Sequence, residues 1–127
     1  PQKQALSEFC RKLTNIEQKD VDGAAPFPEA FAEFAAWIGP GSVRLASWSD
    51  YDPRQLRADC SRHAMDYPAA LEPHLDVQAL HARRGGEGPA TMTRALERLS
   101  LTHEGSHHRA LDDARNISRI ACRLLTR

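Results

Sequence analysis

Several features that would assign this sequence to a common protein class are missing from it. Its 127 residues contain only three cysteines, Cys10, Cys60 and Cys122, and no Cys-x-x-Cys pair, which argues against a zinc ribbon and a thioredoxin-type motif. The longest stretch without charge, residues 34–43, is about half of what a membrane-spanning helix needs. No apolar segment follows the first basic residue, so a signal peptide is not indicated. We expect a cytoplasmic protein without membrane contact, whose cysteines are reduced and mostly buried.

Motifs of other enzyme classes are missing too. The glycine-rich segment at residues 85–88 lacks a following Lys-Ser/Thr and a preceding strand, so it is not a phosphate loop. Gly-x-Ser-x-Gly does not occur, which leaves an esterase without support. Seventeen Lys and Arg balance seventeen Asp and Glu, which excludes a global basic field but allows a local basic patch.

The residues that are present predict one domain with many helices. Residues are 41% hydrophobic and 27% charged, as in globular proteins. The spacing predicts helices over residues 7–13, 28–38, 53–65 and 77–83, one capped by Thr91, one starting near Leu111, and a short strand over 42–47. Residues 14–25 are predicted to be irregular. Helices alternating with short strands favour an α/β domain.

Two of these helices have an apolar face at helical spacing. In the first, Ser7 can act as the N-cap, and the apolar face consists of Leu6, Phe9, Cys10 and Leu13. In the last, the core-facing stripe consists of Ala114, Ile117, Ile120, Ala121 and Leu124.

The densest group of reactive side chains lies between His103 and Asp113. His108 stands five positions before Asp113, at the start of the last helix. This spacing suits metal-dependent phosphoryl chemistry, because the carboxylate can hold a divalent cation and the imidazole can accept a proton from water. A structural interpretation stays open, since the helix dipole also favours Asp112 and Asp113 in a first turn and loop histidines can simply be solvated.

A structural zinc site is an alternative for the same segment. His103, His107 and His108 include a pair at positions i and i+4, which can share a metal ion on a helix. Gly105 argues against a helix there, and no cysteine is near. A structural zinc site is therefore disfavoured.

The segment 48–53 follows the predicted strand, at the edge where α/β sheets usually bind ligands. Asp52 can have a purely structural role as the N-cap before Pro53 in the first helical position, and local chemistry favours this role. Trp48 and Tyr51 could stack on a nucleic-acid base, but core packing is favoured for each of them alone.

Three segments together resemble the DEDDh 3′–5′ exonucleases of the DnaQ-like and RNase T superfamily, in the branch of ERI and 3′hExo-like enzymes. They are residues 6–16, 46–52 and 107–117, and the resemblance spans nearly the whole chain. It implies an RNase H-like α/β fold, with a central mixed sheet flanked by helices. The most specific part is His-x4-Asp followed by Ala-Arg-Asn-Ile on an amphipathic helix.

The resemblance also assigns residues. It implies that His108 is the general base and that Asp113 and Asp52 are catalytic, metal-binding carboxylates, with Asp50 a less well-placed rival of Asp52. His107 and Asp112 are then neighbours without a direct role. Substrate contacts are expected at Leu13, Thr14, Ile16 and Trp48.

The implied reaction uses two Mg²⁺ or Mn²⁺ ions and releases nucleoside 5′-monophosphates from the 3′ end of RNA or single-stranded nucleic acid. The family also needs an Asp-x-Glu motif on its first strand, and none occurs in this chain, which begins at Pro1. We expect residues 1–127 to form one exonuclease domain that lacks its N-terminal strands and is weakly active or inactive by itself. The alternative is a non-catalytic nucleic-acid-binding or regulatory module with a degenerate site.

Overall fold

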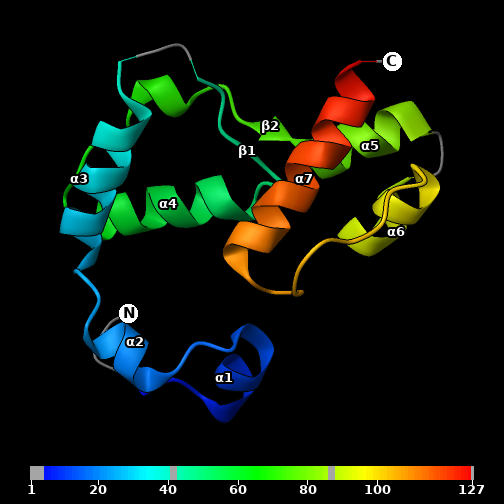
Figure 1. Ribbon diagram of the computed structural model, residues 1–127. Helices are drawn as coiled ribbons and strands as arrows, with labels where there is room; N and C mark the ends of the chain where they lie inside the picture. The colour runs from blue at the N-terminus through cyan, green and yellow to red at the C-terminus, as the bar shows by residue number, and fades with distance from the viewer. Residues whose placement is uncertain (1–4, 41–42, 86–87, 127) are drawn as a thin grey trace.

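The computed structural model describes residues 5–40, 43–85 and 88–126, which fold into helices around one small sheet (Figure 1). Its elements, in chain order, are α1 (Glu8–Thr14), α2 (Gln18–Asp22), α3 (Phe27–Ile38), β1 (Ala46–Ser47), α4 (Tyr51–Arg62), a short 3-10 helix (Ala69–Leu71), β2 (Leu75–Asp76), α5 (Val77–Gly85), α6 (Met92–Arg98) and α7 (Ala110–Leu125). The predicted strand is shorter than expected, and its first residue, Ser42, lies outside the described residues, as do two residues of the 85–88 loop.

The sheet seen in the described residues has two parallel strands. Ala46 pairs with Leu75 and Ser47 pairs with Asp76. A side-chain bond of 2.8 Å between the Ser47 hydroxyl and His74 Nε2 also joins the two segments. The Asp76 carboxylate accepts from the amide of Ala79 at 2.8 Å, so β2 leads directly into a capped α5. The mixed sheet that we expected is therefore represented here by one parallel pair.

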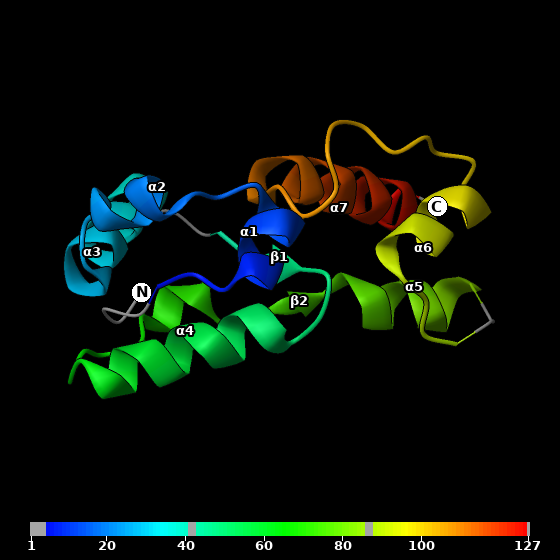
Figure 2. The ribbon, with the colours of Figure 1, turned by 90° about the horizontal axis from the view of Figure 1, so that it is seen from below.

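The larger core lies between α5, α6 and α7, which pack side by side (Figure 2). Its buried members are Val77, Leu80, Ala95, Leu96, Leu99, Ile120, Ala121 and Leu124. Three residues of the predicted stripe on α7 are thus buried and Ile117 packs against them, but Ala114 is exposed, so its assignment to the core was wrong. Asn116 is fully buried on this helix instead.

A smaller core joins α3 to α4. Its buried members are Phe31, Cys60 and Leu71, with partly buried aromatic and aliphatic side chains around them. Burial, together with the nearby charge of Asp59, raises the pKa of the Cys60 thiol and keeps it protonated. Cys10 and Cys122 are exposed, so the expectation of mostly buried cysteines holds for one of three.

The helices α1 and α2 bury no residue (Figure 1). Ser7 caps α1 as predicted, accepting from the amide of Cys10 at 3.1 Å. On the apolar face of α1, Phe9 is 71% exposed, because the described part of the chain places no core residue against it. Residues 14–25 were expected to be irregular, yet Glu17 and Asp20 form a capping box that starts α2.

Among the described residues, no helix combines the length and apolar composition needed to cross a membrane.

Candidate active site

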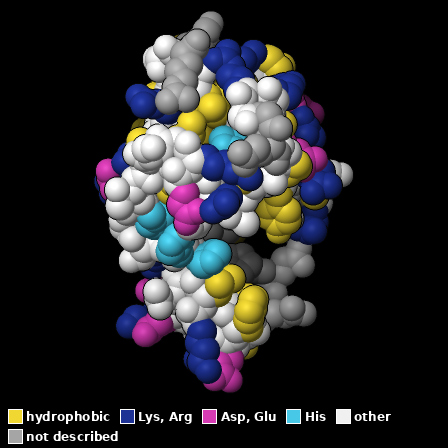
Figure 3. Space-filling model, turned by 90° about the vertical axis from the view of Figure 1, so that its right-hand side faces the viewer, with side chains coloured by type: hydrophobic (Ala, Val, Ile, Leu, Met, Phe, Trp, Pro, Cys, Tyr) yellow, Lys and Arg dark blue, Asp and Glu magenta, His cyan; other side chains and the backbone are white. Residues whose placement is uncertain are grey.

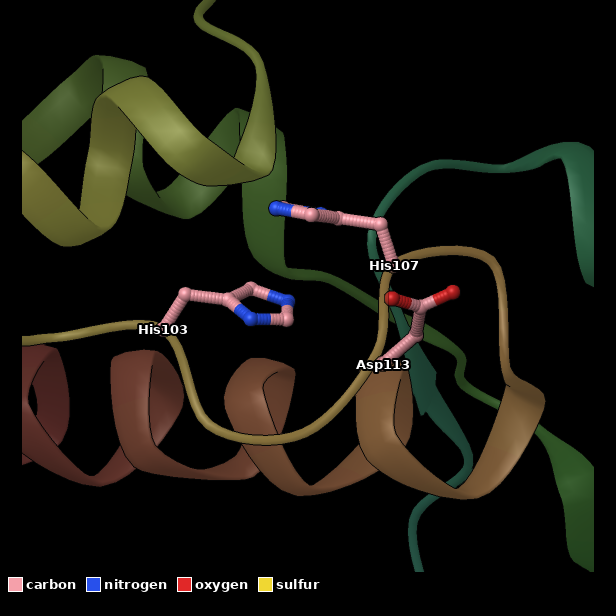
Figure 4. A group of neighbouring side chains, drawn as sticks. All are labelled: His103, His107 and Asp113. Atoms are coloured by element: carbon pink, nitrogen blue, oxygen red, sulfur yellow. The ribbon is translucent and has the colours of Figure 1, made fainter.

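Asp113 lies in the first turn of α7, next to the loop that brings His103 and His107 toward it (Figure 4). One ligand atom of each of these three side chains lies within 4.8 Å of the others. Within the described part of the chain, Asp113 Oδ1 and His103 Nε2 are shielded from solvent and have no hydrogen-bond partner. A buried polar atom without a partner is unfavourable, so this arrangement favours a ligand between the three side chains.

The loop is attached to α7 by Asn116. Its amide oxygen accepts from the backbone N–H of Glu104 at 3.1 Å, and its amide nitrogen donates to the Glu104 carbonyl at 2.8 Å and the Asp112 carbonyl at 2.8 Å. Because Asn116 is fully buried, these bonds are shielded from water. They hold the backbone next to His103 against the helix that carries Asp113.

Further contacts hold the same loop. Arg119 donates to the Thr102 carbonyl at 2.7 Å and forms an ion pair with Glu104 at 3.2 Å. The Asp112 carboxylate accepts from the Ser106 amide at 3.0 Å. Position 105 needs glycine, because φ is +77° and a Cβ there would lie 2.3 Å from Asp112 Cγ. Asp112, expected to have no direct role, thus shapes the loop.

His108 lies outside the group of three. Its φ is +60°, a left-handed conformation, and its side chain is exposed. The rings of His103 and His107 stack with centroids 3.8 Å apart, whereas the His107 and His108 rings are 6.4 Å apart. Figure 3 shows histidine side chains side by side on the surface of this face. The structure therefore brings His107 to Asp113, and leaves His108 on the solvent side.

Asp52 is exposed in the first turn of α4. Its interpretation as an N-cap was wrong: Asp50 holds the N-cap position, the helix begins at Tyr51, and the Asp50 carboxylate pairs with Arg54 at 3.4 Å instead. Asp52 makes no hydrogen bond or ion pair with the described residues and is not a member of the group around Asp113. A free carboxylate without a capping role is available for another function.

The expected substrate contacts fall into two environments. Trp48 is half-buried, packs against the larger core and lies 6.4 Å from the His81 ring, which agrees with a packing role. Leu13 and Ile16 are more than a third exposed at the C-terminal end of α1. The Thr14 hydroxyl donates to the Cys10 carbonyl at 2.8 Å and accepts from the Ile16 amide at 3.2 Å, which shapes this turn.

An open pocket of mixed charge adjoins Ile16, between α1 and α2; Lys12 pairs with Glu8 and Lys19 with Glu17, and Arg11 adds a further positive charge. It is lined by Glu8, Arg11, Lys12, Asn15, Ile16, Glu17, Gln18 and Lys19. Exposed apolar side chains beside positive charge are features that a nucleotide can contact through its base and its phosphate.

The sequence analysis missed the contacts of His103 and His107 with Asp113, and it missed Asn116. One signal for Asn116 was available: it stands four residues before Ile120 and eight before Leu124, so it lies on the apolar face of α7. A polar residue on a buried face must have hydrogen-bond partners.

Comparison with known proteins decides the family. The model of the exonuclease family, RNase T, matches residues 1–121. The chain belongs to this exonuclease family. Similar proteins include the 3′–5′ exonuclease Snipper of Drosophila melanogaster, 29% identical over 94% of this chain and 50% of its own, and ERI1 exoribonuclease 2 of Xenopus laevis, 29% identical over 94% and 21%. The chain thus spans half or less of the length of these relatives.

Solved exonuclease structures share the fold. The nuclease domain of 3′hExo, a DEDDh family member bound to rAMP, has a TM-score of 0.89 and 26% identity, covering 99% of this chain and 68% of its own. The cell-death related nuclease CRN-4 has a TM-score of 0.85 at 20% identity, over 99% and 47%, and supports the fold alone. The expected RNase H-like fold and the resemblance to DEDDh exonucleases are confirmed.

This family implies divalent cations, and the residues present fit one at Asp113. Its Oδ1 atom is buried without a partner in the described structure, next to two imidazole rings. Asp52 supplies a second, unpaired carboxylate. It is not one of the residues whose ligand atoms lie within 4.8 Å of one another, which are His103, His107 and Asp113. The fit is therefore direct for Asp113 and rests on the family resemblance for Asp52.

Proposed function

We propose that this chain is the exonuclease domain of a metal-dependent 3′–5′ exonuclease that removes nucleoside 5′-monophosphates from the 3′ end of RNA or single-stranded nucleic acid. Membership of the exonuclease family over residues 1–121 supports the activity. The substrate class is supported by relatives named exoribonucleases and by a similar structure described as recognising the histone mRNA stem-loop at its 3′ end.

One observation in the structure supports the site above all others. The carboxylate of Asp113, at the start of α7, has a buried oxygen without a hydrogen-bond partner among the described residues. A bound cation would satisfy such an oxygen. Asp113 also resembles the final metal-binding Asp of the family. We assign the cation to Asp113 and Asp52 together, as Mg²⁺ or Mn²⁺.

When bound, the divalent cations would stabilise the charge that develops on the phosphate and on the leaving oxygen. The residues of this chain supply the rest. His108 stands on an exposed loop position where its imidazole can accept a proton from the attacking water. Asn116 and Arg119 hold that loop against α7, which limits the positions that His108 can sample relative to Asp113.

The 3′ nucleotide needs a surface to stack on and a counter-charge for its phosphates. Leu13 and Ile16 offer exposed apolar side chains, and Arg11 supplies positive charge in the adjoining pocket, where Lys12 and Lys19 pair with glutamates. We propose that this turn contacts the terminal nucleotide, with Thr14 fixing its backbone.

The test is degradation of 3′-labelled RNA and DNA by the full-length protein, with and without EDTA. We expect EDTA to abolish product release. Replacing His108 with alanine should lower kcat by about 10²- to 10⁴-fold, the range for loss of a general base. Asp113→Asn should lower it further, because it removes the charge that holds a cation.

Matched controls are His63→Ala and Asp66→Asn, both exposed and outside the site. They should retain wild-type rates. Wild-type rates in His108→Ala and Asp113→Asn as well would contradict the assignment. Nucleic-acid binding without EDTA-sensitive degradation would instead support the alternative, a non-catalytic nucleic-acid-binding or regulatory module.

A further inference from the structure

Two histidines that the proposed nuclease mechanism does not use lie beside Asp113. His103 and His107 each place a ring nitrogen within 4.8 Å of an Asp113 carboxylate oxygen and of each other (Figure 4). His103 Nε2 is buried without a hydrogen-bond partner in the described part of the chain, as is Asp113 Oδ1. A role as solvated loop histidines does not account for a buried ring nitrogen facing an unpaired carboxylate.

The position of these histidines is built into the fold. Asn116 fixes the backbone of Glu104, the residue after His103, by two hydrogen bonds. The Asp112 carboxylate fixes the amide of Ser106, the residue before His107. Both attachments come from α7, the helix that carries Asp113. One rigid helix therefore holds all three donor groups in position.

The donor set selects the kind of ion. Two imidazole nitrogens and one carboxylate oxygen match the three protein ligands of zinc sites that keep an open fourth position. Imidazole suits Zn²⁺, Co²⁺ and Ni²⁺, whereas Mg²⁺ prefers oxygen ligands. The site therefore differs in chemistry from one built on carboxylates alone.

The ring geometry requires one movement. The two imidazoles stack with their planes 26° apart, so their lone pairs do not yet point at a common centre. His107 is exposed, and its ring can turn about χ1 and χ2 without displacing packed neighbours. His103, whose nitrogen is already buried toward Asp113, stays in place.

We propose that His103, His107 and Asp113 form a binding site for one transition-metal ion of the zinc type. Its ion takes Asp113 as a ligand, so it competes with the Mg²⁺ or Mn²⁺ that the nuclease site would hold through the same carboxylate. Only this competition rests on the proposed function; the binding itself rests on the three side chains.

The experiment is a calorimetric titration of the intact protein with Zn²⁺ in the presence of excess Mg²⁺, which occupies sites that prefer oxygen ligands. We expect one Zn²⁺ per chain. Loss of a partner outside the ligand set of a metal site already lowers affinity by about 10- to 100-fold, so His103→Ala and His107→Ala should each weaken Zn²⁺ binding at least as much. Mg²⁺ binding should stay unchanged in both variants.

His108→Ala is the matched control, since it removes the adjacent histidine that lies outside the group. It should bind Zn²⁺ like the wild type. Unchanged Zn²⁺ affinity in His103→Ala and His107→Ala, or an equal loss in His108→Ala, would overturn the proposal. If His103→Ala unfolds, His107→Ala and His107→Gln decide, because that side chain is exposed. Because the experiment measures Zn²⁺ binding, a protein without nuclease activity can still support this proposal, and an active nuclease can still contradict it.

Discussion

The two ends of the chain use their apolar residues in opposite ways. The C-terminal helices α5, α6 and α7, with the C-cap residue Leu99 of α6, contribute the whole buried set of the larger core, and Ile120 is completely buried. The N-terminal helices α1 and α2 bury nothing, although Phe9, Leu13 and Ile16 are just as apolar. The C-terminal unit therefore stabilises the fold, whereas the N-terminal pair presents apolar side chains to the outside.

This difference separates positions that affect stability from positions that can affect binding. Asp113 stands on the helix with the best-packed face, so its carboxylate has a rigid base. Leu13 stands on α1, which buries no residue, and Ile16 lies in the turn that follows it, so both side chains are open to a partner.

The largest effect on stability is expected for Ile120→Ala. Removing a completely buried side chain from a packed core costs about 2–5 kcal/mol, because the cavity fills only in part. The free energy of unfolding should be measured by urea denaturation, with Leu125→Ala as a control on the exposed side of the same helix. If the free energy of unfolding fell by less than about 1 kcal/mol, α7 would not be packed as described.

An intermediate effect is expected for Asn116→Ala. It leaves the Glu104 amide and carbonyl without their partner, which costs about 2 kcal/mol when such groups stay shielded from water. Urea denaturation measures the loss, and kcat should fall more than stability alone explains, because the histidine loop is released. Asn116→Asp keeps an acceptor but places a carboxylate oxygen against the Glu104 and Asp112 carbonyls at a fully buried position, so it should destabilise the protein at least as much as Asn116→Ala. Unchanged stability together with unchanged kcat in Asn116→Ala would show that the loop does not depend on this residue.

The smallest effect on stability is expected for Leu13→Ala. Exposed positions without special contacts change the free energy of unfolding by about 0.5 kcal/mol or less. If the turn contacts the terminal nucleotide, KM for RNA should nevertheless rise. Phe9→Ala is the matched control, since Phe9 is exposed on the same helix but is not an expected contact. Equal KM values in both variants and the wild type would leave Leu13 without a substrate role.

Much of the fold could be predicted from local sequence. The period of Ile117, Ile120, Ala121 and Leu124 identified the buried face of α7, and Ser7 and Thr91 were recognised as N-caps before their helices. These signals are local, because capping and helical spacing involve residues at most a few positions apart. The same spacing wrongly assigned Ala114 to the core, since periodicity shows that a face is apolar and not what covers it.

The candidate site, like the fold, was predictable only where residue type and chain order decide. Chain order and residue type were enough to select His108, Asp113 and Asp52 and to connect them with a family that the comparisons confirm. Their roles stay predictions. The pairing of His103 and His107 with Asp113 depends on a loop whose path is set by Asn116, Asp112 and Gly105 across six to twelve residues. No local rule specifies such a path.

The sequence by itself therefore determined the family, the helical periods and the identity of the ionisable residues, because each follows from residue type and spacing. Only the tertiary structure decided which histidines face Asp113 and that α1 stays uncovered. The physical reason is that both depend on hydrogen bonds and packing between segments distant in the chain, and Gly105 and Asn116 allow two histidines in a loop to meet without any helix between them.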